Sequence, residues 1–129
     1  YLGFDDAIFA AGRILQIVAQ SNQKVSEMLA DLPVTAYTPE IRIDCPDDKK
    51  FEIVSELTEF FRKQYEVIDI DGVRINFNDG WALIRASNTQ PVLVLRFEAE
   101  TQSRLKELVG IIKKQMDHYQ PVVQFDYQA

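Results

Sequence analysis

The sequence predicts an α+β domain in which two helices cover one face of an antiparallel sheet, and three observations support this prediction. Apolar residues recur at helical spacing in residues 46–61 and again after Thr101. Between these segments lie four runs rich in β-branched, aliphatic and aromatic residues, separated by short polar turns. The resulting order, β-α-β-β-β-β-α, predicts a two-layer sandwich over about residues 36–118, within a domain of residues 34–129.

The first strand and first helix of this domain are indicated by residues 40–61. Glu40–Ile43 alternates charged and apolar residues as a strand does, and Cys45-Pro46 ends it. Pro46 suits a first helical turn, where the carboxylates of Asp47 and Asp48 complement the positive end of the helix dipole. The residues expected in the core recur at helical spacing: Phe51, Val54, Leu57 and Phe61.

Four strands joined by three turns follow and form a meander. Asp71-Gly72 is a strong signal for a two-residue hairpin, Asn78-Asp79-Gly80 makes the second turn, and Ser87–Gln90 makes the third. Because alternate turns of a meander lie at opposite ends, Gly72 and the third turn are expected at one edge. The predicted strands are Tyr65–Ile70, Val73–Phe77, Trp81–Arg85 and Val92–Ala99.

The last helix begins after Thr101, a favourable N-cap residue. Its apolar residues are expected to face the sheet: Leu105, Leu108, Ile112 and Met116. The segment Pro121–Ala129 is compatible with an edge strand and equally with a loose tail.

Residues 1–33 read as helices that lack the rest of their core. Asp5 and Asp6 favour a helix start, and the apolar residues of Ala7–Ala19 then cover more than one face. A second short helical segment around Met28 ends before Pro33. These residues are too few to form a domain, so we expect a piece of a longer protein, with a boundary near residues 33–39.

Composition excludes several classes of function. The 129 residues, 47% of them hydrophobic, suffice for one domain plus an appendage, and the net charge of -6 makes nucleic acid and anionic membrane poor partners. The single cysteine, Cys45, excludes an internal disulfide and fits a reducing cytosol. Cys45 and His118 cannot assemble a zinc site, and no secretory signal or membrane helix is expected.

The segment Arg85–Pro91 concentrates anion-binding groups between two apolar strands. Its arginine offers a planar donor fork, and Ser87, Asn88 and Thr89 add hydroxyl and amide donors, a combination that suits phosphate. Pro91 restricts the residue before it, which limits collapse of the loop. Although the same residue types also build ordinary hairpins, the only ionisable residues between Asp79 and Glu98 are arginines, 85 and 96. For the second of these, inside a strand, packing or an ion pair is expected.

The loop RASNTQP resembles the phosphate-binding loop in the last domain of the α-D-phosphohexomutases, in particular the phosphomannomutase/phosphoglucomutase branch. Other branches commonly carry Gly-Thr-Glu after the serine, where this chain has Asn88-Thr89. The opening YLGFDDAIFAAGRIL resembles the helix that closes the third domain of these enzymes. The resemblance therefore covers nearly the whole chain, with residues 1–33 as the end of the third domain and 34–129 as the C-terminal domain.

The resemblance implies a cytoplasmic isomerase that moves phosphate between the 1 and 6 positions of a hexose, and a TATA-box-binding-protein-like fold for this domain. Arg85, Ser87, Asn88 and Thr89 match the residues that hold the non-transferring phosphate, and no catalytic residue is expected on this chain. The partners implied are hexose phosphates and the remaining domains. The Mg²⁺ cofactor would be bound elsewhere in the parent enzyme, so the chain alone is expected to be inactive.

Two other functions are compatible with the sequence. One is a free-standing α+β domain that binds another small anion or a protein partner. The other, a serine hydrolase using Ser87, would need a base, and nothing places the single histidine, His118, beside that serine.

Overall fold

The computed structural model describes Gly3 and residues 5–127, and the chain divides into two compact units with the boundary between Pro33 and Val34. The first unit contains the helix α1 (Ala7–Gln20) and the short 3-10 helix η1 (Val25–Glu27). None of the residues of α1 is buried. Its apolar side chains therefore present a surface that the described part of this unit does not cover.

The second unit has the predicted order of elements, with one short strand added before it. None of the described helices has both the length and the apolar character needed to cross a membrane. The elements are β1 (Ala36–Tyr37), β2 (Ile41–Asp44), α2 (Asp47–Arg62), β3 (Glu66–Ile68), β4 (Val73–Phe77), β5 (Gly80–Ala86), β6 (Val92–Ala99), α3 (Gln102–Met116) and the 3-10 helix η2 (Asp117–Tyr119).

All strands pair antiparallel in the order β1-β6-β5-β4-β3, and β2 also pairs with β6. β1 and β2 thus follow each other along the same edge of β6. Thr38 joins them, because its N–H donates to the carbonyl of Phe97 at 3.0 Å and its Oγ1 accepts the N–H of Phe97 at 3.1 Å. Sequence patterns did not reveal β1, which is only two residues long.

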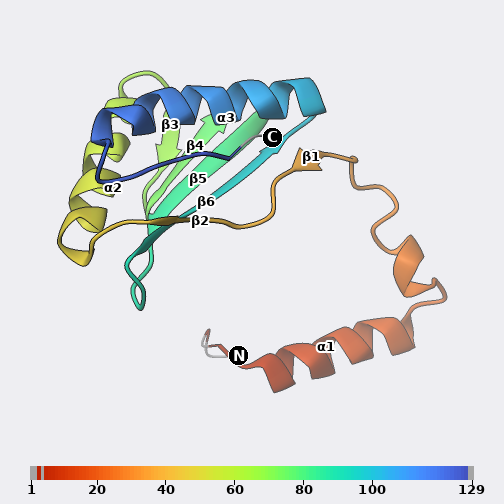
Figure 1. Ribbon diagram of the computed structural model, residues 1–129. Coiled ribbons are helices and arrows are strands. Elements are labelled where there is room, and N and C mark those ends of the chain that lie inside the picture. The colour runs from red at the N-terminus through yellow and green to blue at the C-terminus, as the bar shows by residue number, and fades with distance from the viewer. Residues whose placement is uncertain (1–2, 4, 128–129) are drawn as a thin grey trace. The chain divides into compact units, whose positions relative to one another are not determined.

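Helices α2 and α3 lie on one face of the sheet (Figure 1). Alternation along β5 buries Ala82, Ile84 and Ala86 on this side. The inward stripe predicted for the last helix is confirmed in α3. The largest fully buried side chains include Leu57, Phe61, Ile75, Ile84, Leu93, Leu95, Phe97, Leu105, Leu108 and Ile112.

The prediction that Phe51 lies in the core is wrong, because its side chain is 56% exposed. The buried stripe of α2 runs instead through Lys50, Val54, Leu57 and Phe61. Successive helix positions differ by about 100°, so an inward Lys50 turns its neighbour toward solvent. The apolar pattern therefore identified the helix correctly but assigned its first buried turn to the wrong residue.

The connection between β3 and β4 also differs from the prediction. It spans four residues, Asp69–Gly72, rather than the two-residue hairpin at Asp71-Gly72. The strand expected to reach Ile70 ends earlier, and Arg62 of α2 donates to the carboxylate of Asp69. Gly72 has a φ of 83°, and a Cβ at this position would collide with the backbone carbonyl of Ile84 and with Arg85. Gly72 thus lies against the end of β5 from which the third turn leaves, at the edge where both were expected.

The segment after η2 is neither of the two alternatives predicted for it, as far as residue 127. It forms no strand, yet Val123 and Phe125 are buried. The ring of Phe125 stacks on that of Phe97, with centroids 6.2 Å apart. This segment completes the core beside β6, while residues 128 and 129 lie outside the described part.

Candidate anion-binding site

The β5–β6 loop, residues 87–91, is fixed by backbone hydrogen bonds at both of its ends. The N–H of Ser87 donates to the carbonyl of Val92 at 3.0 Å. At the other end, the N–H of Cys45 donates to the carbonyl of Pro91 at 2.8 Å. The second bond joins the loop to the segment between β2 and α2, so the loop is also held by a part of the chain outside β5 and β6.

Ser87 is buried and gives the loop its internal shape. Its Oγ accepts the N–H of Gln90 at 3.2 Å and, more weakly, that of Thr89 at 3.4 Å. Because both bonds use the oxygen as acceptor, the hydroxyl hydrogen is still a donor. Within the described residues, no acceptor is recorded for it.

Asn88 and Thr89 form the exposed tip of the loop. Neither side chain has a hydrogen-bond partner among the residues that the structure describes, and the same holds for the backbone N–H of Asn88. The tip therefore offers a side-chain amide, a hydroxyl and a backbone N–H to solvent or to a ligand.

Arg85 is at the end of β5, two residues before Ser87, on the face of the sheet opposite to the helices. Its Nη1 donates to Oδ2 of Asp71 at 2.9 Å, and the two side chains are 42% and 59% exposed. An ion pair this exposed contributes little to stability, and a guanidinium with one partner keeps other N–H groups available. The structure thus brings Arg85 and the loop to the same edge of the sheet.

Two cations beside the loop were missed by sequence reasoning. Lys50 of α2 donates to the carbonyl of Gln90 at 3.0 Å, and Arg42 of β2 donates from Nη1 to the side-chain Oε1 of the same residue. Both lie 40 or more positions away along the chain, so a local count of charges could not include them. Arg96 is exposed and has no ion pair with any described residue, so the ion-pair role considered for it is not observed.

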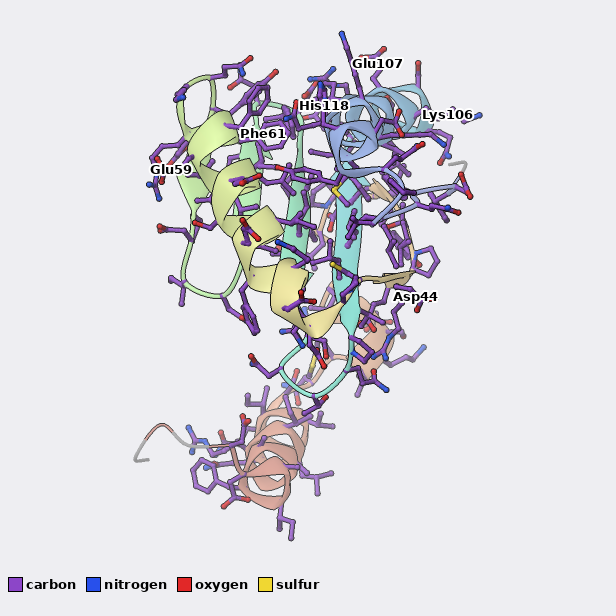
Figure 2. The ribbon with its side chains drawn as sticks, turned by 60° about the vertical axis from the view of Figure 1, so that its left-hand side comes forward. Asp44, Glu59, Phe61, Lys106, Glu107 and His118 are labelled. Atoms are coloured by element: carbon purple, nitrogen blue, oxygen red, sulfur yellow. The ribbon has the colours of Figure 1, made fainter. Side chains whose placement is uncertain are left out.

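The groups needed for a serine or cysteine nucleophile are not assembled among the described residues of this site. Figure 2 shows His118 at the end of the domain away from the β5–β6 loop. The Nδ1 of His118 lies 3.1 Å from the carbonyl of Gln115, at the end of α3, so it cannot act as a base for Ser87. Burial, with a further contribution from Asp48, raises the pKa of the Cys45 thiol, which disfavours the nucleophilic thiolate.

The resemblance implies a magnesium ion whose ligands lie elsewhere in the parent enzyme. Among the described residues of this chain, no three His, Cys, Asp or Glu side chains come together in a group that could hold a metal ion.

Comparison with known proteins identifies a consistent set of relatives. The family model described as phosphoglucomutase/phosphomannomutase, C-terminal domain, matches residues 40–115. A phosphomannomutase/phosphoglucomutase from Pseudomonas putida is 38% identical over 128 residues, which are 98% of this chain and 28% of the relative. A phosphoglucomutase from Neisseria gonorrhoeae is 42% identical over 116 residues, which are 88% of this chain and 25% of the relative.

A solved structure agrees with these sequence matches. It is that of a phosphoglucomutase/phosphomannomutase family protein from Burkholderia thailandensis, which superposes with a TM-score of 0.74 at 29% identity. The superposition covers 98% of this chain and 27% of that protein. The chain therefore spans about a quarter of the length of the proteins that it matches.

Proposed function

Because this chain belongs to the phosphoglucomutase/phosphomannomutase family and matches the C-terminal domain of its members, we propose that residues 34–129 bind the phosphate of a hexose phosphate that is not being transferred. The parent protein would interconvert hexose 1- and 6-phosphates through a hexose 1,6-bisphosphate. In this proposal Arg85 supplies the charge and the donor fork, while Ser87, Asn88 and Thr89 supply neutral donors.

The strongest support for this proposal is the exposure of the Arg85 side chain and its pairing with a single exposed carboxylate among the described residues. Its guanidinium is half-exposed and held by one exposed carboxylate, that of Asp71, so a dianionic phosphate can compete for it. Beside it, the loop is fixed at both ends, while the donors of its tip are unpaired within the described residues. Donors that are held in place without being used suit ligand binding better than internal packing.

Such a site would act through orientation rather than proton transfer. Gripping one phosphate directs the opposite end of the sugar toward a reacting group, which would lie on another domain of the parent protein. A terminal phosphate is also a handle common to both orientations of a bisphosphorylated intermediate. We place the hinge for closure of this domain at residues 33–39, the segment around the boundary between the two units.

The remaining parts of the proposal concern the parent protein. Residues 1–33 would complete the preceding domain, which would cover the apolar side chains that α1 leaves exposed. Magnesium would be held by residues outside this chain. We also propose a cytoplasmic location, to which the free thiol of Cys45 is suited.

The test is the activity of the full-length protein that contains this chain, assayed for conversion of glucose 1-phosphate and mannose 1-phosphate to the 6-phosphates. Arg85→Ala should raise KM at least tenfold, about the loss expected when a charge-assisted contact to substrate is removed. Arg96→Ala, which removes an exposed arginine from the neighbouring strand, is the matched control and should leave KM unchanged. Equal KM values for the wild-type protein and Arg85→Ala would refute the proposal.

A further inference from the structure

Lys50 is the only charged side chain that is buried among the described residues. A buried ammonium group is costly unless hydrogen bonds and an opposite charge compensate for its lost hydration. Lys50 has both, since its Nζ pairs with Oδ1 of Asp47 and donates to the carbonyl of Gln90 at 3.0 Å. The side chain is 4% exposed, so its ammonium is not available to a ligand in solvent.

The partner of Lys50, Gln90, is the most heavily bonded residue of the β5–β6 loop. Its N–H donates to Oγ of Ser87 at 3.2 Å, and its carbonyl accepts from the N–H of Val92 at 2.9 Å as well as from Lys50. Its side-chain oxygen accepts from Nη1 of Arg42. Two elements outside the loop therefore hold the same residue, one from within the core and one at the surface.

The two external contacts differ in strength for a physical reason. Arg42 is 55% exposed and also pairs with the carboxylate of Glu40, and its contact with Gln90 is made to the side-chain amide rather than to the backbone. The contact of Lys50 comes from a side chain that is 4% exposed, where a charge-assisted hydrogen bond is stronger than one made by an exposed group. From outside the loop, the Gln90 carbonyl is thus held by Lys50, in addition to the bond from Val92 within the loop.

We propose that Lys50 is a positioning residue for phosphate binding: from the first turn of α2 it holds the carbonyl of Gln90 and thereby fixes the conformation of the β5–β6 loop. The proposal rests on the proposed function of that loop. Without the ammonium, the Gln90 carbonyl loses its buried partner, and the bonds that Gln90 and Val92 make within the loop open more often. The donors of Asn88 and Thr89 would then have to be ordered by the ligand, which weakens its binding.

The neighbouring residue provides a matched control. Lys49 is in the same turn of α2, but its ammonium pairs with Glu52 on the surface, and the side chain is 48% exposed. Lys49→Met removes the same charge and leaves the loop contact intact. Thr58→Val is a second control, because Thr58 is a buried polar residue of α2 whose hydroxyl donates to the carbonyl of Val54 in its own helix and, in the part of the chain that the structure describes, to no residue of the loop.

The experiment uses the ¹⁵N-labelled 129-residue chain, with amide hydrogen exchange and titration by inorganic phosphate as its two measurements. Lys50→Met should accelerate exchange at Gln90 and Val92 at least fivefold relative to the core amides, and should weaken phosphate binding at least threefold. Lys50→Arg, which keeps the charge, should restore part of both. Lys49→Met and Thr58→Val should leave the loop amides and the phosphate affinity as in the wild-type chain.

Each outcome decides the proposal. Unchanged loop exchange and phosphate affinity in Lys50→Met would overturn it, as would equal effects in Thr58→Val. If Lys50→Met does not fold, Lys50→Gln is the replacement, since its neutral and shorter side chain is expected to give the same loop opening. If the wild-type chain binds no phosphate, the proposed function fails, while the exchange rates still show whether Lys50 fixes the loop.

Discussion

Two arginine–aspartate pairs lie at opposite ends of the sheet, and they differ in how completely the arginine is used. At the β5–β6 end, Arg85 pairs with Asp71 at 2.9 Å. At the end that carries the β4–β5 turn, Arg104 pairs with Asp79, also at 2.9 Å. The distance alone would make the two pairs equivalent.

The surroundings of the two arginines separate them. Arg104 donates to a second carboxylate, that of Glu107, at 2.7 Å, and its guanidinium lies 5.9 Å from the ring centre of Phe77. Its bonds to Glu107 and Asp79 raise the pKa of the Arg104 guanidinium. Among the described residues Arg85 pairs with one carboxylate, and its side chain is more exposed, at 42% against 28%. A binding role is therefore indicated by unused donors rather than by the presence of an ion pair.

The largest expected difference between the two ends concerns phosphate. Arg85→Ala should weaken binding of inorganic phosphate to the chain by about tenfold to a hundredfold, because one charge-assisted hydrogen-bonding group contributes roughly 1.5–3 kcal/mol. Starting from the millimolar affinity expected for an isolated domain, this would bring binding close to the limit of detection by NMR titration. If Arg104→Ala weakened phosphate binding as much, the two arginines would not differ in their role in binding.

The next largest effect concerns stability, to which Arg104 should contribute more than Arg85. Arg104→Ala should lower the free energy of unfolding by about 1 kcal/mol, since it removes two partly exposed charged hydrogen bonds and a contact with the ring of Phe77. Arg85→Ala should change the free energy of unfolding by less, about 0.5 kcal/mol. Urea unfolding followed by circular dichroism measures both. A larger loss for Arg85→Ala would identify it as the structural arginine of the two.

A smaller effect is expected from the partner carboxylate. Asp71→Asn removes a negative charge that competes with phosphate for Arg85 while keeping the shape of the side chain. Exposed ion pairs contribute about 0.2–1 kcal/mol, so phosphate affinity should rise by roughly twofold to fivefold. Titration at low and high salt checks the electrostatic origin, because the gain should shrink as screening increases. Weaker phosphate binding in Asp71→Asn would mean that this carboxylate positions Arg85 for the ligand.

The smallest effect at neutral pH should come from Tyr119, a half-buried residue that belongs to neither pair. Burial, followed by its hydrogen bond to Glu56, raises the pKa of Tyr119 to about 12 from an ordinary value of 10. The neutral hydroxyl thus stabilises the fold below pH 10, and this contribution is lost as the pH rises from 10 to 12. Tyr119→Phe should leave phosphate affinity unchanged and reduce the decline in stability over this alkaline range. An equally steep decline in Tyr119→Phe would assign it to other groups.

The features that sequence patterns predicted are those that short segments determine. Alternation along residues 80–86 and the turn at residues 78–79 fix the central strands, and the composition of residues 85–91 identifies the exposed donors. Because these properties depend on neighbours along the chain, one sequence suffices to read them. The assignment of Arg85, Ser87, Asn88 and Thr89 as phosphate ligands remains a prediction.

The features that sequence patterns did not predict depend on contacts between segments that are distant along the chain. Lys50 and Gln90 are 40 positions apart, and only the packing of α2 against the end of the sheet brings them together. The same packing makes Lys50 rather than Phe51 the inward residue, although hydrophobicity alone favours the phenylalanine. The alternation of residues 122–127 is compatible with an edge strand, and only the complete fold shows that Val123 and Phe125 pack into the core without joining the sheet.

The measurement that tests the central claim most directly is a titration of the ¹⁵N-labelled chain with glucose 1,6-bisphosphate, followed residue by residue in NMR spectra. If the β5–β6 end of the sheet holds a phosphate, the amides of residues 87–90 should shift together and saturate with one dissociation constant. If the resonances of these amides do not shift while those of residues near Asp79 and Arg104 do, the phosphate site lies at the opposite end of the sheet from the one proposed.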